Sequence, residues 1–228
     1  MVPDRSPSPS PSLRSPAPRS SPASPPSLAA RKRQMVSEEL RETALQLLAA
    51  RGYDETTVDD IVAAAGMSRR TFHRYYASKE DVVIQLLADL GAEMRAELGG
   101  RPESEPPAES LRRAVTVAIN FCAGHHDAAK TLAVVRLILR TPVLHARSLE
   151  RQAGWQADLA AVLAARLNLP VDALYPEVAA RLAFVALNTA LERWALTDGE
   201  ADPLELTDRA FEMLAPALAG QGLGEVGG

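Results

Sequence analysis

The sequence predicts an all-α protein with a small helical domain near the N-terminus and a larger helical domain after it. Three observations favour this class. Ala and Leu dominate the 228 residues and aromatic side chains make up only 4%, a composition typical of helices rather than strands. After residue 34, apolar residues recur at helical spacing. No stretch shows the apolar–polar alternation of a half-buried strand.

Composition limits the class of protein further. Hydrophobic residues make up 46% and charged residues 24%, which is ordinary for a globular protein. Cys122 is the one cysteine, which excludes a disulfide scaffold and favours a reducing, cytoplasmic setting. No apolar run approaches the roughly 18 residues of a membrane span, so no membrane partner is expected. The net charge of −4 argues against a wholly basic nucleic-acid binder, but residues 66–79 hold four basic side chains and no acid. A polyanion needs only such a local face.

Residues 1–33 are predicted to form a disordered tail with a basic end. Nine of the 17 prolines lie before residue 28, and the segment has few large apolar groups to offset the entropy of ordering. The tail is either an interaction arm or a dispensable extension. Its basic end, Arg31-Lys32-Arg33, could reach phosphates or a minor groove.

Residues 34–82 predict a three-helix domain, followed by a connecting helix over 83–100. Ser37 is the expected N-cap of the first helix and Gly52 its C-terminal stop. The second helix begins at Thr57 and ends at Gly66, where glycine permits a sharp turn. The third begins at Ser68. Two short helices joined by a tight turn form a helix-turn-helix, whose second helix enters the major groove of DNA.

The residues of this motif suggest distinct roles. Arg69 and Arg70, in the first turn of the third helix, are placed to reach base edges, where arginine favours guanine. Thr57 and Lys79 suit phosphates on either side. The apolar Ile61, Phe72 and their small neighbours hold the helices together. The full set of candidate DNA contacts is Thr57, Ser68, Arg69, Arg70, Thr71, His73, Arg74, Tyr75 and Lys79.

The stretch "TTVDDIVAAAGMSRRTFHRYYASKEDVV" resembles the DNA-binding signature of the TetR family of transcriptional regulators. The order, the spacing and the place near the N-terminus all match. Two positions depart from the usual pattern, because His73 stands for an aromatic ring and Tyr76 for phenylalanine. The resemblance implies a palindromic DNA operator, a homodimer, and a C-terminal domain that binds an effector and dimerises.

Residues 108–220 are predicted to form that second domain, separated from the first by a linker over 99–107. Helices are expected near 108–124, 127–140, 142–168, 173–197 and 203–219. Several are apolar on most faces, as buried or interface helices are. The segments "LILRTPVLHARSLERQAGWQADLAAVLAARLN" and "FVALNTALERWALTDG" also resemble the mycofactocin-system regulators, a TetR subgroup associated with acyl-coenzyme A (acyl-CoA) ligands.

Polar and aromatic residues within these helices are candidate effector contacts. Arg136 interrupts an apolar run, and a buried guanidinium must pair with an anion, either an effector or a protein carboxylate such as Glu150. Arg147 and Arg151 flank the same region. The aromatic rings could be pocket walls or core, and the asparagines could read a ligand or a neighbouring helix. The candidates are Asn120, Phe121, Arg136, Arg147, Arg151, Trp155 and Asn188.

No residue pattern points to a metal, a cofactor or a catalytic centre. The run His125-His126-Asp127 suits a turn between helices, because adjacent side chains on a helix diverge by about 100°. Cys122 is expected to be a small core residue. The sequence therefore predicts a ligand-responsive DNA-binding repressor rather than an enzyme. The alternative is a constitutive or architectural DNA-binding protein with no effector.

Overall fold

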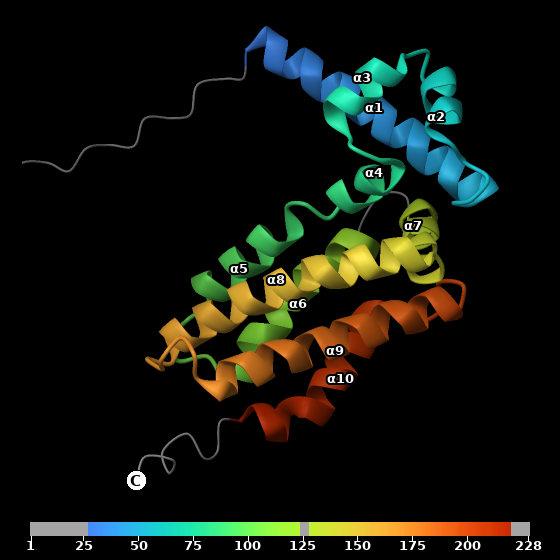
Figure 1. The fold of residues 1–228 in the computed structure, drawn as a ribbon. Coiled ribbons are helices and arrows are strands. Elements are labelled where there is room, and N and C mark those ends of the chain that lie inside the picture. Colours follow the sequence, from blue (N-terminus) through green and yellow to red (C-terminus); the bar gives the residue numbers. More distant parts are fainter. Residues whose placement is uncertain (1–26, 124–127, 220–228) are drawn as a thin grey trace, which may run out of the picture.

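The computed structural model describes residues 27–123 and 128–219 and shows ten α-helices with no strand in those ranges (Figure 1). The all-α fold class is therefore confirmed. Residues 1–26 of the predicted tail and the His125-His126-Asp127 run lie outside the described residues.

The first four helices form one body and the remaining six form a second, larger bundle below it in Figure 1. The five helices predicted after residue 107 agree with the structure to within two residues at each end. The bounds are α1 Leu28–Arg51, α2 Val58–Ala64, α3 Arg69–Tyr75, α4 Lys79–Gln85, α5 Leu90–Gly100, α6 Pro107–Ala123, α7 Ala128–Arg140, α8 Pro142–Arg166, α9 Leu174–Leu196 and α10 Pro203–Leu218.

Helix α1 begins well before the predicted start. Ser27 is its N-cap and accepts a hydrogen bond from the Ala30 amide, so the predicted N-cap at Ser37 is wrong and residues 28–33 of the predicted tail are helical. Ser37 instead meets Tyr76. The Tyr76 hydroxyl donates to the Ser37 carbonyl at 2.9 Å and lies 2.9 Å from Ser37 Oγ. This contact provides partners for the hydroxyl that distinguishes Tyr76 from the phenylalanine usual in the family.

The predicted connecting helix over 83–100 is two helices, because the chain turns at residues 86–89 between α4 and α5. Amides 86, 87 and 88 bond to carbonyls three residues back, which tightens the backbone out of the α-helix. Beyond the turn, Leu90, Met94 and Leu98 are buried in the core of the second bundle. Helix α5 therefore belongs to the second body, and the boundary between the bodies lies at this turn.

The predicted linker over 99–107 is a turn held by hydrogen bonds and ion pairs, and it does not separate the two bodies. Arg101 donates to Glu105 at 2.6 and 2.9 Å, and Glu105 also accepts from Ser110 Oγ at 2.7 Å. Arg166 on α8 donates to the carbonyls of Arg101 and Pro102. These contacts fix the turn from α5 to α6 against the far end of α8.

A separate apolar cluster joins the two bodies. Leu45 and Leu48 of α1 and Val83 of α4 pack with Val134 of α7 and Leu144 of α8. All five side chains are buried. Because α4 and α8 both contribute side chains to this cluster, a shift of α8 would displace residues of the first body through direct contact.

Candidate nucleic-acid interface and internal cavity

The helix-turn-helix is built from local signals that the structure confirms. Thr57 caps α2 in a capping box, in which its hydroxyl accepts from the Asp60 amide and the Asp60 carboxylate accepts from the Thr57 amide. Gly66 has φ of +64°, the left-handed conformation that glycine adopts without strain. Ser68 then caps α3 by accepting from the Thr71 amide at 3.1 Å.

Phe72 anchors α3 to the rest of the first body. Its side chain is 0% exposed and packs with Leu40 and Ala44 of α1, Ile61 of α2 and Val82 of α4. The Phe72 ring lies 5.7 Å from the Tyr76 ring, which is also buried. These inward rings fix which side of α3 faces outward.

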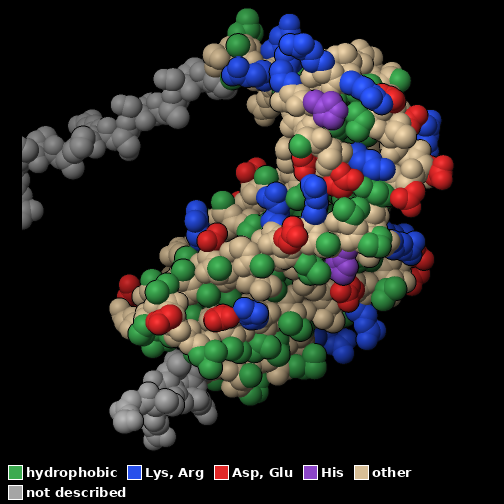
Figure 2. All heavy atoms as spheres, in the orientation of Figure 1, with side chains coloured by type: hydrophobic (Ala, Val, Ile, Leu, Met, Phe, Trp, Pro, Cys, Tyr) green, Lys and Arg blue, Asp and Glu red, His purple; other side chains and the backbone are tan. Residues whose placement is uncertain are grey.

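The outward side of α3 is cationic and open to solvent. Arg70, His73 and Arg74 are exposed and lie three and four residues apart, so they share one face of the helix. Figure 2 shows Lys and Arg side chains gathered at the end of the molecule formed by α3 and the start of α1, where Arg31, Lys32 and Arg33 are exposed. This end has the local positive charge that a polyanion requires.

Arg69, although predicted to reach base edges, forms an ion pair on the protein surface with the neighbouring helix α2. Its guanidinium donates two hydrogen bonds to the Asp59 carboxylate on α2. The hydrogen bonds from Arg69 hold the pKa of the Asp59 carboxyl below its usual value. Both side chains are more than half exposed, and solvent-exposed ion pairs contribute little to stability. Arg69 can therefore leave Asp59 at little cost, whereas Arg70 makes no ion pair with any described residue.

The remaining predicted DNA contacts differ in how many hydrogen bonds their side chains already make within the protein. Arg74 donates to the Tyr75 hydroxyl at 3.0 Å, and its guanidinium carbon lies 4.9 Å from the centre of the Tyr75 ring. Thr71 Oγ1 lies 3.0 Å from Ser68 Oγ. Lys79 donates to the carbonyls of Tyr53 at 2.6 Å and Thr56 at 2.9 Å. Two of the three Lys79 ammonium protons thus form hydrogen bonds with the loop before α2. Lys79 therefore holds the helix-turn-helix in place, and it also adds a positive charge near the surface of the motif.

An internal cavity of about 110 Å³ lies in the second body between α6, α7, α8, α9 and the α4–α5 turn. Leu87, Leu90, Ala118, Cys122 and the α7 residues Val135, Ile138 and Leu139 form an apolar wall. The opposite wall, from α8 and α9, carries polar groups. They are His145, Ser148, Gln152, Asn188 and Glu192, with Trp155 beside them.

Of the sequence-predicted effector residues, two line this cavity. Trp155 and Asn188 do so, whereas Phe121 lines a different cleft and Asn120 is exposed on α6. The other polar lining residues on α8, namely His145, Ser148 and Gln152, were not among the residues predicted from the sequence. Together with Trp155, these residues are spaced three or four positions apart, which places all four on one face of a helix. That periodicity is the signal in the sequence from which they could have been predicted.

The three predicted arginines lie outside the cavity lining. Arg136 pairs with Asp198 and donates to the Ala195 carbonyl at 3.1 Å, so the structural-pair interpretation holds but the suggested partner Glu150 is wrong. Arg147 donates to Asp81 of α4 at 2.6 Å. Arg151 is half-buried, and its Nε has no hydrogen-bond partner among the described residues.

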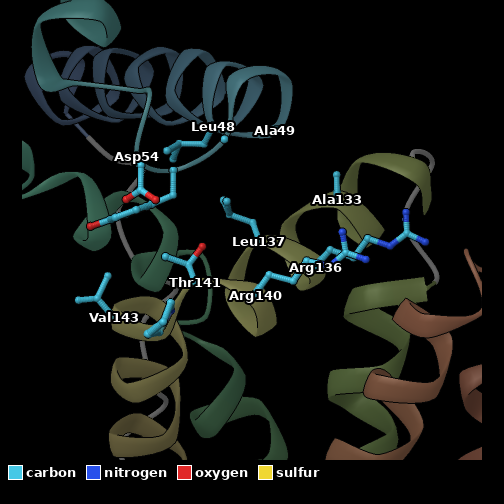
Figure 3. Close-up of a pocket in the computed structure, with 12 residues that line it drawn as sticks. Leu48, Ala49, Asp54, Ala133, Arg136, Leu137, Arg140, Thr141 and Val143 are labelled. Atoms are coloured by element: carbon cyan, nitrogen blue, oxygen red, sulfur yellow. The ribbon is translucent and has the colours of Figure 1, made fainter.

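A second hollow, a cleft of about 620 Å³, separates the two bodies (Figure 3). Leu48, Ala49 and Asp54 lie on the side of the first body, and Ala133, Arg136, Leu137 and Arg140 of α7 lie opposite. The bodies therefore meet through the apolar cluster, the Arg147–Asp81 pair and an ion pair between Lys130 of α7 and Glu42 of α1, with an open space beside them.

Other chemistry finds no support in the described part of the chain. Cys122 is 5% exposed, and burial raises the pKa of its thiol to about 12, so the thiolate is scarce at neutral pH. Within residues 27–123 and 128–219, no three His, Cys, Asp or Glu side chains gather as metal ligands would. No helix in those ranges has both the length and the apolar character for crossing a bilayer.

The fold and the exposed basic face of α3 define a helix-turn-helix DNA-binding protein. Residues 40–86 match the family described as bacterial regulatory proteins, tetR family, and residues 105–219 match the MftR C-terminal domain. The chain belongs to the TetR family, as its sequence resemblance predicted, and it carries the C-terminal domain of the MftR type.

Comparisons with individual proteins agree with this assignment. The chain is 31% identical to the HTH-type transcriptional regulator TcmR of Streptomyces glaucescens, over 89% of this chain and 92% of TcmR. It is 30% identical to the putative mycofactocin biosynthesis transcriptional regulator MftR of Mycobacterium tuberculosis, over 82% and 93%. It also resembles the structure of Thermus thermophilus FadR, a TetR-family repressor in complex with lauroyl-CoA (26% identity, 84% and 100% coverage, TM-score 0.51). The protein is thus a transcriptional regulator rather than an enzyme.

Proposed function

We propose that this protein is a dimeric, ligand-responsive repressor that binds a palindromic operator and leaves it when an amphipathic effector such as an acyl-CoA binds. The observation that carries the DNA-binding part is the outward cationic face of α3, held in place by the buried Phe72 ring. Arg70 and Arg74 would reach bases, while Thr57, Ser68, Thr71, His73, Tyr75 and Lys79 would contact or position phosphates. Such a regulator would act in the cytoplasm, beside the chromosome.

Replacing Arg70 with alanine is expected to lower discrimination between operator and unrelated DNA by about 1–3 kcal/mol, because one base contact is lost. Fluorescence anisotropy with labelled DNA from upstream of the gene, and with a shuffled duplex, measures both affinities. Arg95→Ala, at an exposed arginine of α5, is the matched control and should change neither affinity. Equal weakening on both duplexes would contradict a base-reading role for Arg70. No salt-dependent binding by the unmodified protein would contradict DNA binding itself.

The dimer would form through α9. Its exposed apolar residues Leu174, Val178, Val185 and Leu196 recur at helical spacing along one side, opposite the buried face that holds Ala183, Leu187 and Ala190. A monomer rarely leaves a long apolar stripe open to water. Two-fold pairing through α9 would set two α3 helices about one DNA turn apart, as two half-sites require.

Two observations support an effector in the internal cavity. The lining is mostly apolar with a few polar groups on one wall, which is the usual character of ligand sites. The matched C-terminal domain and the lauroyl-CoA found in the Thermus relative favour an acyl-CoA. The free cavity is smaller than an engineered cavity of roughly 150 Å³ that binds benzene. A longer ligand would therefore have to push α8 away from α6 and α7.

Arg147 would carry that movement to α3. The Asp81 carboxylate accepts from Arg147 through one oxygen and, at 3.0 Å, from the Ala77 amide through the other. Ala77 follows directly after the C-cap of α3. A displacement of α8 would thus pull on the turn that ends the recognition helix and favour a conformation with misplaced half-sites.

Arg147→Gln is expected to leave operator affinity nearly unchanged and to reduce the release caused by lauroyl-CoA about fivefold or more, the lower range of typical allosteric coupling. Operator titrations with and without lauroyl-CoA give the coupling directly. Arg140→Gln removes an exposed arginine from α7 and serves as the control. Full release in the Arg147 variant would show that the ion pair does not transmit the signal.

The small volume of the cavity favours a second candidate function, a regulator that binds DNA constitutively. Thermal unfolding in the presence of acyl-CoA esters separates the two functions, because a ligand that binds only the folded state raises the melting temperature. No stabilisation by any acyl-CoA, together with normal operator binding, would favour the constitutive regulator.

A further inference from the structure

The walls of the internal cavity differ in a way that selects the chemistry of its ligand. The five polar groups all come from α8 and α9, whereas the walls formed by α6, α7 and the α4–α5 turn are apolar. No lysine or arginine is among the described residues that line the space. The one lining carboxylate, Glu192, is exposed, as is Leu149, so these two mark the outer edge of the cavity.

Of the three arginines near the cavity, Arg151 does not line the space, and the other two are engaged elsewhere. Arg136 is held by Asp198 and a carbonyl oxygen on the α9 side, and Arg147 by Asp81 of α4. No lysine or arginine of the described lining could neutralise a buried carboxylate, and a carboxylate buried without a cation is disfavoured. The cavity is therefore suited to an uncharged group.

Two side-chain amides face each other on the polar wall. Asn188 Nδ2 of α9 donates to Gln152 Oε1 of α8 at 2.9 Å, and both residues are half-buried. This bond uses one donor and one acceptor of the pair. The Gln152 amide protons and Asn188 Oδ1 have no other hydrogen bond among the described residues. An incoming carbonyl can accept from Gln152, and an amide or hydroxyl proton can donate to Asn188.

We propose that Gln152 and Asn188 together recognise the uncharged polar end of an acyl ligand, such as the carbonyl of a thioester or an amide, and that the cavity rejects the free carboxylate. The acyl chain lies against the apolar wall of α6 and α7. This inference rests on the effector part of the proposed function and names the chemical group that the site reads.

The test is isothermal titration of the full-length protein with an eight-carbon series of octanoyl-CoA, octanamide and octanoate, with coenzyme A alone as a further ligand. The expected result is binding of octanamide and octanoyl-CoA, and binding of octanoate at least tenfold weaker. Gln152→Met and Asn188→Leu should each weaken octanamide roughly two- to tenfold, the range for loss of one neutral hydrogen bond. Asn120→Leu makes the same change as Asn188→Leu at an exposed site and should leave binding intact.

The outcomes separate this inference from the function on which it rests. Octanoate binding as tightly as octanamide would overturn the inference alone, and loss of that binding in Arg151→Gln would assign the anion to Arg151. Unchanged octanamide binding in both amide variants, with circular dichroism confirming that they are folded, would also overturn it. If no member of the series binds while operator binding is normal, the effector site fails and DNA binding stands.

Discussion

Phe72→Ala is expected to destabilise the first body by about 3–5 kcal/mol, the usual cost of removing a buried phenylalanine ring. The ring is wholly buried between α1, α2 and α4, and no other α3 side chain is as deeply placed. Since the outward direction of Arg70 and Arg74 depends on this anchor, operator binding should be lost as well.

Thermal and urea unfolding monitored by circular dichroism measure the effect. His73→Ala is the matched control, because the next residue on the same helix is exposed and its removal should change the unfolding free energy by no more than about 0.5 kcal/mol. A Phe72→Ala variant with an unchanged midpoint and normal operator affinity would refute the role of the ring as the anchor of α3.

Gly91→Ala is expected to destabilise the second body by about 1–3 kcal/mol, the usual range for overpacking. A Cβ at this position would overlap Trp155 Cδ1, so the indole ring must move. Trp155 lines the internal cavity, and its ring lies 6.4 Å from that of Phe184. The substitution should therefore alter ligand binding as well as stability.

Gly99→Ala provides a control on the same helix. Its Cβ would meet its nearest neighbour, Val162 Cγ1, at 4.0 Å, an ordinary contact, so only the helix propensity changes. That change is expected to stabilise the protein by up to about 1 kcal/mol. Calorimetric melting of the two variants tests the contrast, and a Gly91→Ala protein as stable as Gly99→Ala would mean that Trp155 yields without cost.

The first body could be predicted from sequence because local residues mark most of its boundaries. Thr57, Gly66 and Ser68 act within three or four residues of their own positions, and the structure confirms each of them. Ser37 does not cap the helix as predicted, because serine is a good N-cap and an equally good partner for a distant hydroxyl. The break between α4 and α5 carries no proline or glycine. Packing of α5 against the second bundle determines it instead.

The candidate effector site was less predictable because its decisive contacts join distant parts of the chain. Arg136 and Arg147 find their partners 62 and 66 residues away, so no local pattern could distinguish a structural ion pair from a ligand contact. The two candidate asparagines, Asn120 and Asn188, differ only in which side of its helix each one lies on. Asn188 faces the cavity and Asn120 faces solvent, and that orientation depends on which neighbours each helix packs against.

The turn at residues 86–89 has a practical consequence for engineering hybrid regulators. If the DNA-binding domain is exchanged at this turn, the exchanged part contains α1 to α4, and α5 keeps its native apolar neighbours. If the chain is joined at residues 101–106 instead, Leu90, Met94 and Leu98 are separated from the core residues they pack against. Yet the transplanted domain carries Asp81 while Arg147 stays with the recipient. On the proposed coupling through Arg147, a chimaera is expected to respond to an effector only when donor and acceptor restore that charge pair between them.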